Sequence, residues 1–235
     1  MPFHNKNIFS VIVAGGSGSR MKSVIPKQFL PLFEKPILVH TVEKFLKIPH
    51  RQLIVVIPEK DAAFWEEIIE GNETLVQAKE DGILKTVFGG ETRYQSVRNG
   101  LESIDHAEGL VAIHDSVRPL VSLEAIENSF NEAFMHGSAV LAVPLKDSIR
   151  KMDKDGSNHA IDRNDLRIIQ TPQTFRLHRI KAAFSLGEQP FFTDDSSVYE
   201  YAGHPVHLIP GEDTNIKITT PKDLLMAELI TKENK

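Results

Sequence analysis

The chain has 235 residues, long enough for one large α/β domain with a full hydrophobic core. A net charge of −5 gives no sign of a nucleic-acid partner, so any site for anions has to be built locally. The absence of cysteine excludes disulfides, thiolate metal sites and cysteine nucleophiles.

Apolar runs alternate with amphipathic stretches, which predicts an α/β fold with a mostly parallel sheet flanked by helices. Ser122 is the expected N-cap of one helix, and Pro36 is expected in the first turn of another. The expected strands are 8–14, 53–57, 86–88, 110–114 and 139–143, and the expected helices are 37–46, 62–69, 123–136 and a last one opening at Pro221.

No repeat or linker divides the sequence, so we expect residues 1–235 to form a single domain. No apolar run reaches the roughly 20 residues of a membrane span. The apolar segment near the N-terminus is too short for a signal peptide. We therefore expect a cytoplasmic protein that binds neither membranes nor nucleic acid.

A glycine-rich loop follows the first expected strand. Its glycines leave backbone N–H groups free to converge on phosphate oxygens. It lacks the Gly-Lys-Ser/Thr ending of a Walker loop, and Met21 stands where the dinucleotide motif needs a glycine. A plain turn after a strand is the alternative. The loop comprises Ala14, Gly15, Gly16, Ser17, Gly18, Ser19 and Arg20.

Two cations accompany this loop. Arg20 ends it, and Lys27 follows within Pro26-Lys27-Gln28, where the proline restrains the chain. Two positive charges beside a set of amides can bind a triphosphate and stabilise charge that develops on a phosphorus during transfer. We therefore expect Arg20 and Lys27 to act in catalysis.

Asp115 directly follows the expected strand 110–114 and is the candidate ligand for a magnesium ion. Ligands of open α/β sheets bind beyond the carboxyl ends of strands, and magnesium prefers one or two carboxylates plus phosphate oxygens. A turn or helix-cap aspartate is the alternative. His114 is expected in the core, and His204 and His207 are expected to be surface residues.

Further polar motifs follow. The glycines of GGETRYQSV, residues 89–97, allow close approach to a base or a ribose. Four later motifs are Asp162-Arg163-Asn164, Thr171-Pro172-Gln173, Thr193-Asp194-Asp195 and Asn215-Ile216-Lys217. Each of them alone fits a turn or a cap, and Thr193-Asp194-Asp195 also fits the start of a helix. Together they supply cations and hydroxyls suited to a second phosphate.

Residues 145–166 are polar, with the turn signal Asp155-Gly156 near their centre. Residues 148–152 alternate weakly, as a strand does. We expect a hairpin that projects from the domain, because a structureless excursion of about 20 residues is uncommon in a compact domain. A solvated loop is the alternative.

No motif supplies an obvious general base. A phosphomonoester has a second pKa of about 6, so it is already largely dianionic at neutral pH. A phosphate nucleophile needs alignment and charge shielding more than deprotonation. The residues thus predict an enzyme that transfers a nucleotide from a nucleoside triphosphate to a small phosphorylated metabolite.

Taken in order, these motifs resemble the 2-C-methyl-D-erythritol 4-phosphate cytidylyltransferase family. The resemblance covers nearly the whole chain. It implies a Rossmann-like nucleotidyltransferase fold with a β-hairpin arm, a divalent cation such as Mg²⁺, and a homodimer. The implied reaction transfers CMP from CTP to methylerythritol phosphate in non-mevalonate isoprenoid synthesis. The motifs are AGGSGSRM, PKQFL, GGETRYQSV, HDSVRP, DRNDL, QTPQ, FTDDSSVYEYAG and NIKITTPKDL.

The same resemblance implies site residues. Arg20, Lys27 and Lys217 would be catalytic, and Asp115 would hold the metal. In the family the arm, here about 145–166, embraces the neighbouring subunit and completes its site with Ser148 and Arg163. The implied CTP ligands are Ala14, Gly15, Gly16, Gly18, Arg20, Lys27, Gly90, Glu91, Ser96 and Asp115. The implied ligands of the acceptor, a polyol phosphate, are Arg118, Ser148, Arg163, Thr171, Thr193 and Lys217.

Some positions depart from the family pattern. The first loop reads VAGG where PAAG is frequent. Glu91 replaces a frequent aspartate, and Ser148 a frequent threonine. Thr214 stands where an acidic residue is frequent, with Asp213 one position earlier, which leaves a second metal carboxylate open.

Two other functions compete with this interpretation. A ribitol 5-phosphate cytidylyltransferase shares AGGxGSRM, PKQF, HDSVRP and NIKITTP, whereas DRNDL and TDDSSVYE favour the methylerythritol enzymes. A non-catalytic nucleotide-binding subunit of a larger assembly is the second alternative. The retained cations and carboxylate argue against it; they are Arg20, Lys27, Asp115 and Lys217.

Overall fold

The structure, a computed structural model, describes residues 7–15, 21 and 25–233. Within them a seven-stranded sheet has the order β11-β7-β10-β6-β1-β4-β5. β10 runs antiparallel to both neighbours, and the other described pairings in this sheet are parallel, so the predicted α/β fold with a mostly parallel sheet is confirmed. The strands are β1 (Ile8–Val13), β4 (Gln52–Ile57), β5 (Leu84–Phe88), β6 (Leu110–Asp115), β7 (Ser138–Pro144), β10 (Arg167–Arg176) and β11 (Leu208–Pro210).

Helices cover both faces of this sheet. Side chains alternate along β1, so Ile8 and Ile12 enter one core cluster while Phe9 and Val11 enter the other. The first cluster packs against α1 (Ile37–Phe45), α2 (Ala62–Glu70), α3 (Glu73–Glu80) and α5 (Leu123–His136). The second packs against α4 (Arg93–Glu102), α6 (Leu177–Phe184) and α7 (Asp195–Tyr201).

The helix ends follow local chemistry. Ser122 caps α5 as predicted, because its Oγ accepts from the N–H of Ala125 at 2.9 Å. Asp194 caps α7 within a capping box, which confirms a helix start at the Thr193-Asp194-Asp195 motif. Pro36 precedes α1 instead of occupying its first turn, since its backbone is extended, at φ −56° and ψ 145°. The predicted position of this proline is therefore wrong by one residue.

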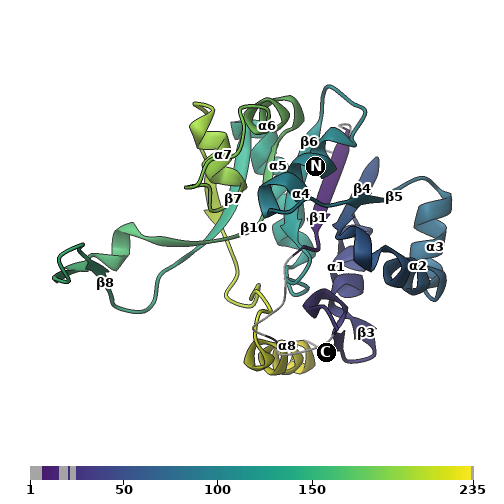
Figure 1. The fold of residues 1–235 in the computed structure, drawn as a ribbon, viewed down its shortest axis with the longest axis horizontal. Coiled ribbons are helices and arrows are strands. Elements are labelled where there is room, and N and C mark those ends of the chain that lie inside the picture. Colours follow the sequence, from purple (N-terminus) through teal and green to yellow (C-terminus); the bar gives the residue numbers. More distant parts are fainter. Residues whose placement is uncertain (1–6, 16–20, 22–24, 234–235) are drawn as a thin grey trace.

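Residues 145–166 contain the predicted hairpin, so the alternative of a solvated loop is wrong. β8 (Ile149–Met152) pairs antiparallel with β9 (Asn158–Ile161), and Gly156 in the turn has φ 86°. Figure 1 shows this arm extending well beyond the sheet, on the left of the view. A short 3₁₀ helix, η4 (Arg163–Asp165), then leads into β10.

The predicted last helix is α8 (Pro221–Glu233). It joins a small third core with Leu32 and Ile37, to which Ile218 and Ala227 contribute from the C-terminal side. This core fixes the segment that precedes α8. None of the helices that the structure describes is both long enough and apolar enough to cross a bilayer.

His50 lies buried beside the first core cluster. Its Nδ1 is 2.9 Å from the carbonyl oxygen of Ile48, which can only accept, so Nδ1 carries the proton. Ser10 Oγ, at 2.7 Å, then donates to Nε2. Burial lowers the pKa of His50 from 6.5 to about 4. The folded protein thus holds this ring neutral.

We expect His50 to make folding stability depend on pH below about 6.5. The folded pKa lies below the unfolded one, so the stabilisation is complete above pH 6.5 and is lost as the pH falls toward 4. Between pH 7 and pH 5, the wild type should lose about 2 kcal/mol more unfolding free energy than His50→Gln. Urea unfolding at both pH values measures this difference. The exposed His178, changed to Gln, is the control and should behave like wild type; equal losses in all three proteins would contradict the prediction.

Candidate active site

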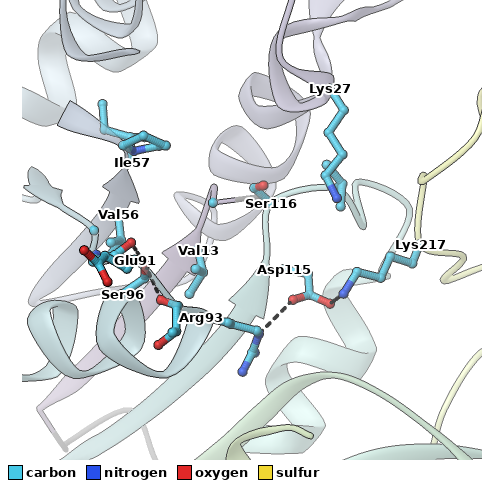
Figure 2. Close-up of a pocket in the computed structure, with 16 residues that line it drawn as sticks. Val13, Lys27, Val56, Ile57, Glu91, Arg93, Ser96, Asp115, Ser116 and Lys217 are labelled. Carbon is cyan, nitrogen blue, oxygen red and sulfur yellow. Dashed lines mark hydrogen bonds and ion pairs between the residues drawn. The ribbon is translucent and has the colours of Figure 1, made fainter. Parts of the chain in front are cut away.

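A cleft lies where the carboxyl ends of β1, β4 and β6 meet the loops that follow them, the position expected for ligands of a parallel sheet. Figure 2 shows Lys27 and Lys217 directed toward the part of the cleft that contains Asp115, with Glu91 and Ser96 on the opposite side. We call this cleft the first hollow. Its lining includes Val13, Gly15, Lys27, Ile57, Pro58, Gly90, Glu91, Arg93, Ser96, Asp115 and Lys217.

Asp115 lies at the centre of a charge cluster at the end of β6. Its Oδ2 is 2.9 Å from Lys217 Nζ and 3.3 Å from Arg118 Nε, and its Oδ1 is 3.5 Å from Arg93 Nε. Burial would raise the pKa of Asp115, but the positive charges of these three side chains outweigh burial and hold the pKa well below its ordinary range. The carboxylate therefore stays ionised and is a poor proton acceptor.

The surroundings of Asp115 fit a magnesium ion. Magnesium usually takes one or two protein carboxylates and completes its octahedron with water and phosphate oxygens. Asp115 supplies one carboxylate at a strand end, within a cleft whose other groups suit phosphates. Asp213, the candidate for a second carboxylate, instead pairs with Lys146 at 2.5 Å and is exposed. Its position does not supply a second ligand beside Asp115.

A second hollow adjoins the first and shares Arg93, Asp115 and Lys217 with it. The structure thus brings together four of the six residues implied for acceptor binding, from four separate segments of the chain: Arg118, Thr171, Thr193 and Lys217. The two hollows meet at the carboxylate of Asp115, so a group in one can approach a group in the other there.

Thr171 is fixed by a chain of hydrogen bonds at the base of the second hollow. Its Oγ1 accepts from the N–H of Asp115 at 3.0 Å and lies 3.1 Å from His114 Nδ1. His114 Nε2 lies 3.1 Å from the carbonyl oxygen of Arg118, so Nε2 carries the proton and Nδ1 accepts the hydroxyl hydrogen of Thr171. Burial lowers the pKa of His114 to about 3, which keeps the ring neutral. The hydroxyl of Thr171 therefore has no hydrogen left to donate to a phosphate. Its oxygen can still accept a hydrogen bond from a hydroxyl of the polyol.

Asn215 anchors the segment that presents Lys217. Its buried Nδ2 donates to the carbonyl of Thr171 at 2.8 Å, and its own carbonyl accepts from Arg118 Nη1 at 2.8 Å. The N–H of Ile218 also donates to the carbonyl of Val117 at 2.9 Å. Lys217 is thus held between two anchored neighbours, which directs its ammonium group to Asp115.

Gly90 and Ser96 meet each other at the far side of the first hollow. The N–H of Gly90 donates to Ser96 Oγ at 3.1 Å, and a Cβ added at Gly90 would lie 2.4 Å from Gln95 Cβ. The glycine at position 90 therefore allows the backbone to lie close to the first turn of α4. A Cβ at Gly15 would lie 3.8 Å from Ser96 Oγ, so Gly15 faces the same point. Glu91 beside them is exposed.

Arg93 is a residue of both hollows that sequence reasoning did not single out. Its Nη1 and Nη2 lie 2.8 and 2.7 Å from the two oxygens of Asp195, whose side chain is 1% exposed. Burial opposes the charge of Arg93, but Asp195 more than offsets burial, and the pKa of Arg93 is raised above its ordinary value. The two residues are 102 positions apart, so no spacing in the sequence indicates the pair.

Ser148 and Arg163 lie apart from both hollows of their own chain. Both are exposed on or beside the arm, and Arg163 Nη1 donates to the carbonyl of Lys146. Ala14 is buried after β1, with its N–H donating to Val56. Three of the residues implied for CTP binding lie outside the described residues: Gly16, Gly18 and Arg20.

Comparisons with known proteins identify the family and the fold. The 2-C-methyl-D-erythritol 4-phosphate cytidylyltransferase family matches residues 8–233. A protein of that name from Bacteroides thetaiotaomicron is 43% identical over 91% of this chain and 94% of its own length. Another from Porphyromonas gingivalis is 43% identical over 94% of this chain and 96% of its own. The crystal structure of 4-diphosphocytidyl-2C-methyl-D-erythritol synthase from Anaerococcus prevotii has a TM-score of 0.83 at 28% identity, covering 98% of each chain. The predicted Rossmann-like fold is confirmed.

The forked pairing of Arg93 with Asp195 should contribute strongly to stability. Lysine keeps the charge but cannot bind both carboxylate oxygens and also face Asp115. Arg93→Lys should therefore lower the unfolding free energy by about 1–3 kcal/mol, the range for a lost hydrogen bond to a buried charged group. Urea denaturation measures the loss. The matched control is Arg98→Lys in the same helix, where exposed Arg98 pairs with Glu102 at 2.8 Å and the change should stay within about 0.5 kcal/mol. Equal losses of unfolding free energy in Arg93→Lys and Arg98→Lys would contradict the role assigned to the pair.

Proposed function

The chain belongs to the 2-C-methyl-D-erythritol 4-phosphate cytidylyltransferase family, and we propose that the first hollow binds CTP and the second binds the polyol phosphate. The enzyme transfers CMP from CTP to 2-C-methyl-D-erythritol 4-phosphate, forming 4-diphosphocytidyl-2-C-methyl-D-erythritol and pyrophosphate. The observation that supports this division is the shared wall of the two hollows, at Arg93, Asp115 and Lys217.

The chemistry needs positioning and charge more than proton transfer. An oxygen of the acceptor phosphate attacks the α-phosphorus of CTP, and the bond from that phosphorus to the bridging oxygen breaks as pyrophosphate leaves. The attacking phosphate is already anionic at neutral pH, so no base has to remove a proton from it. Asp115 is too weak a base for that task, in agreement with this scheme.

The cations supply the charge stabilisation. Lys27 lines the first hollow, and Lys217 belongs to both, so the two ammonium groups flank the region where the phosphates would meet. Preorganised charges of this kind stabilise the oxygens that gain negative charge in transfer. Asp115 would hold Mg²⁺, which when bound supplies further shielding of the triphosphate.

On the acceptor side, Arg118 belongs to the charge cluster around Asp115, while Thr171 can only accept a hydrogen bond from the substrate. We therefore assign the phosphate of the acceptor to the cations, and one of its hydroxyls to Thr171. Thr193 is exposed at the rim of the same hollow. This assignment places the polyol against β10 and the phosphate toward Asp115.

The substrate assignment predicts a preference that steady-state kinetics can measure. With CTP and Mg²⁺, kcat/KM from pyrophosphate release should be at least about 100-fold higher for 2-C-methyl-D-erythritol 4-phosphate than for ribitol 5-phosphate, because a site that pairs buried polar groups with one polyol rejects another. A reaction without acceptor controls for CTP hydrolysis. A preference for ribitol 5-phosphate would overturn the substrate, and no release with either acceptor would indicate a non-catalytic subunit.

The position of the arm supports a homodimer with shared active sites. Arg163 and Ser148 do not line either hollow of their own chain, and Figure 1 shows the arm well separated from the sheet. In a two-fold dimer each arm can reach the partner's second hollow, where Arg163 would add a forked phosphate ligand. The acceptor site is then completed only on assembly.

Mixing two inactive variants tests this sharing. If sites are shared, a hybrid of Lys27→Ala and Arg163→Ala contains one site with both changes and one with neither. Random exchange of equal amounts makes about half of the dimers hybrid, so activity should rise toward about a quarter of the wild-type sites. Mass spectrometry of the intact dimers confirms the exchange. No recovery after confirmed exchange would show that each chain builds its whole site alone.

A further inference from the structure

One carboxylate and two imidazoles converge at a place that the proposed reaction does not use. Glu132 Oε2 lies 3.1 Å from His207 Nε2 and 3.4 Å from His136 Nε2. The two imidazole rings stack, with centroids 4.0 Å apart. One ligand atom from each residue lies within 4.8 Å of the other two. Zinc–ligand distances of about 2.0–2.1 Å place tetrahedral ligand atoms about 3.4 Å apart, a spacing that the two distances from Glu132 match.

The fold fixes the backbone positions of these three residues in advance. Glu132 and His136 are four residues apart in α5, so they share one face of the helix. The N–H of His207 donates to Ser138 Oγ at 3.0 Å, and its carbonyl accepts from the N–H of Val140 at 2.9 Å. His207 is thereby fastened to β7, which starts after the single residue that follows α5, Gly137. The backbone at these positions is therefore set before an ion binds, and binding requires only that the stacked imidazole rings turn toward the ion.

The cluster is remote from the proposed substrate sites. α5 follows β6 and precedes β7, which is parallel to β6, so the helix runs back across the sheet, away from the carboxyl ends of the strands. Its 14 residues span about 20 Å at 1.5 Å each. Glu132 and His136 lie in its last two turns. An ion there cannot contact the phosphates beside Asp115.

We propose that Glu132, His136 and His207 form a second metal site, for Zn²⁺ or a similar transition-metal ion. Imidazole nitrogens suit Zn²⁺, whereas Mg²⁺ prefers oxygen ligands. A set of three protein ligands leaves a fourth position for water, and side-chain exposures of 24–48% leave that position open to solvent. The ion would link the end of α5 to the segment before β11 and would stabilise the fold, because the unfolded chain has no such arrangement.

Calorimetry with the full-length enzyme tests the site. Protein freed of metal with EDTA and then dialysed is titrated with ZnCl₂ in a large excess of MgCl₂, which occupies the site at Asp115. The expected result is one Zn²⁺ bound per chain and a rise in the thermal midpoint that grows with Zn²⁺ concentration. Co²⁺ in place of Zn²⁺ should give the visible absorption of a tetrahedral nitrogen- and oxygen-ligated ion.

Two variants remove single ligands while keeping similar size: Glu132→Gln and His207→Gln. Each should weaken Zn²⁺ binding at least about tenfold and abolish the Co²⁺ absorption, with circular dichroism confirming the fold. The matched control is His178→Gln, because exposed His178 has a single carboxylate partner, Glu108, at 3.3 Å; its affinity should match wild type. Binding that both ligand variants retain, or that excess Mg²⁺ displaces, would overturn the site. So would no binding to the wild type, which would leave Glu132 as a hydrogen-bond partner of His207 only.

Discussion

The charge cluster around Asp115 is the interaction on which both hollows depend. Its cations come from three separate parts of the chain: Arg93 from the start of α4, Arg118 from the turn after β6, and Lys217 from the segment before α8. A buried carboxylate without partners would be costly, as would cations gathered without it. The cluster is therefore favourable only when all three segments are in place. Folding and assembly of the site are the same event.

The cluster also provides positive charge for the substrates. The whole chain carries −5, yet among the described residues four cations line the two hollows: Lys27, Arg93, Arg118 and Lys217. The anionic phosphates of the two substrates can pair with these cations. Because Asn215 and Asp195 fix the cations before any substrate arrives, little reorganisation is needed during transfer, which is the condition under which electrostatic stabilisation is most effective.

The sequence predicted those parts of the fold whose signal is local. β1, β4 and β6 are buried on both faces and read as continuous apolar runs, and the hairpin shows its own turn residues. β10 was missed because polar residues interrupt it at its irregular centre, where the register shifts between Ile169 and Gln173. α4 was missed because it contains Gly100, where a Cβ would lie 2.6 Å from Val11 Cγ1. In both elements, tertiary contacts override the local pattern.

Prediction of the site from the sequence is likewise limited to residues with a local signal. Lys27, Asp115 and Lys217 could be placed in it because each belongs to a short motif with its own chemistry, and the resemblance to a family joined these motifs. The role of Arg93 depends on a partner 102 residues away, and the donor state of Thr171 depends on a neutral His114 whose ring is fixed by the carbonyl of Arg118. Neither property exists until the strands are adjacent, so no local pattern encodes it.

β10 connects the two parts of the proposed acceptor site. The strand begins four residues after Arg163, at the base of the arm, and its irregular centre carries Thr171 in the second hollow. One continuous segment thus contributes a residue to its own chain's site and leads to the residue proposed for the partner's site. The first hollow, by contrast, is built around β1, β4 and β6 of a single chain. In the proposed dimer a single chain forms the walls of the CTP site, whereas the acceptor site would be closed only by the second subunit, so dimerisation would act on acceptor binding and leave CTP binding to the chain itself.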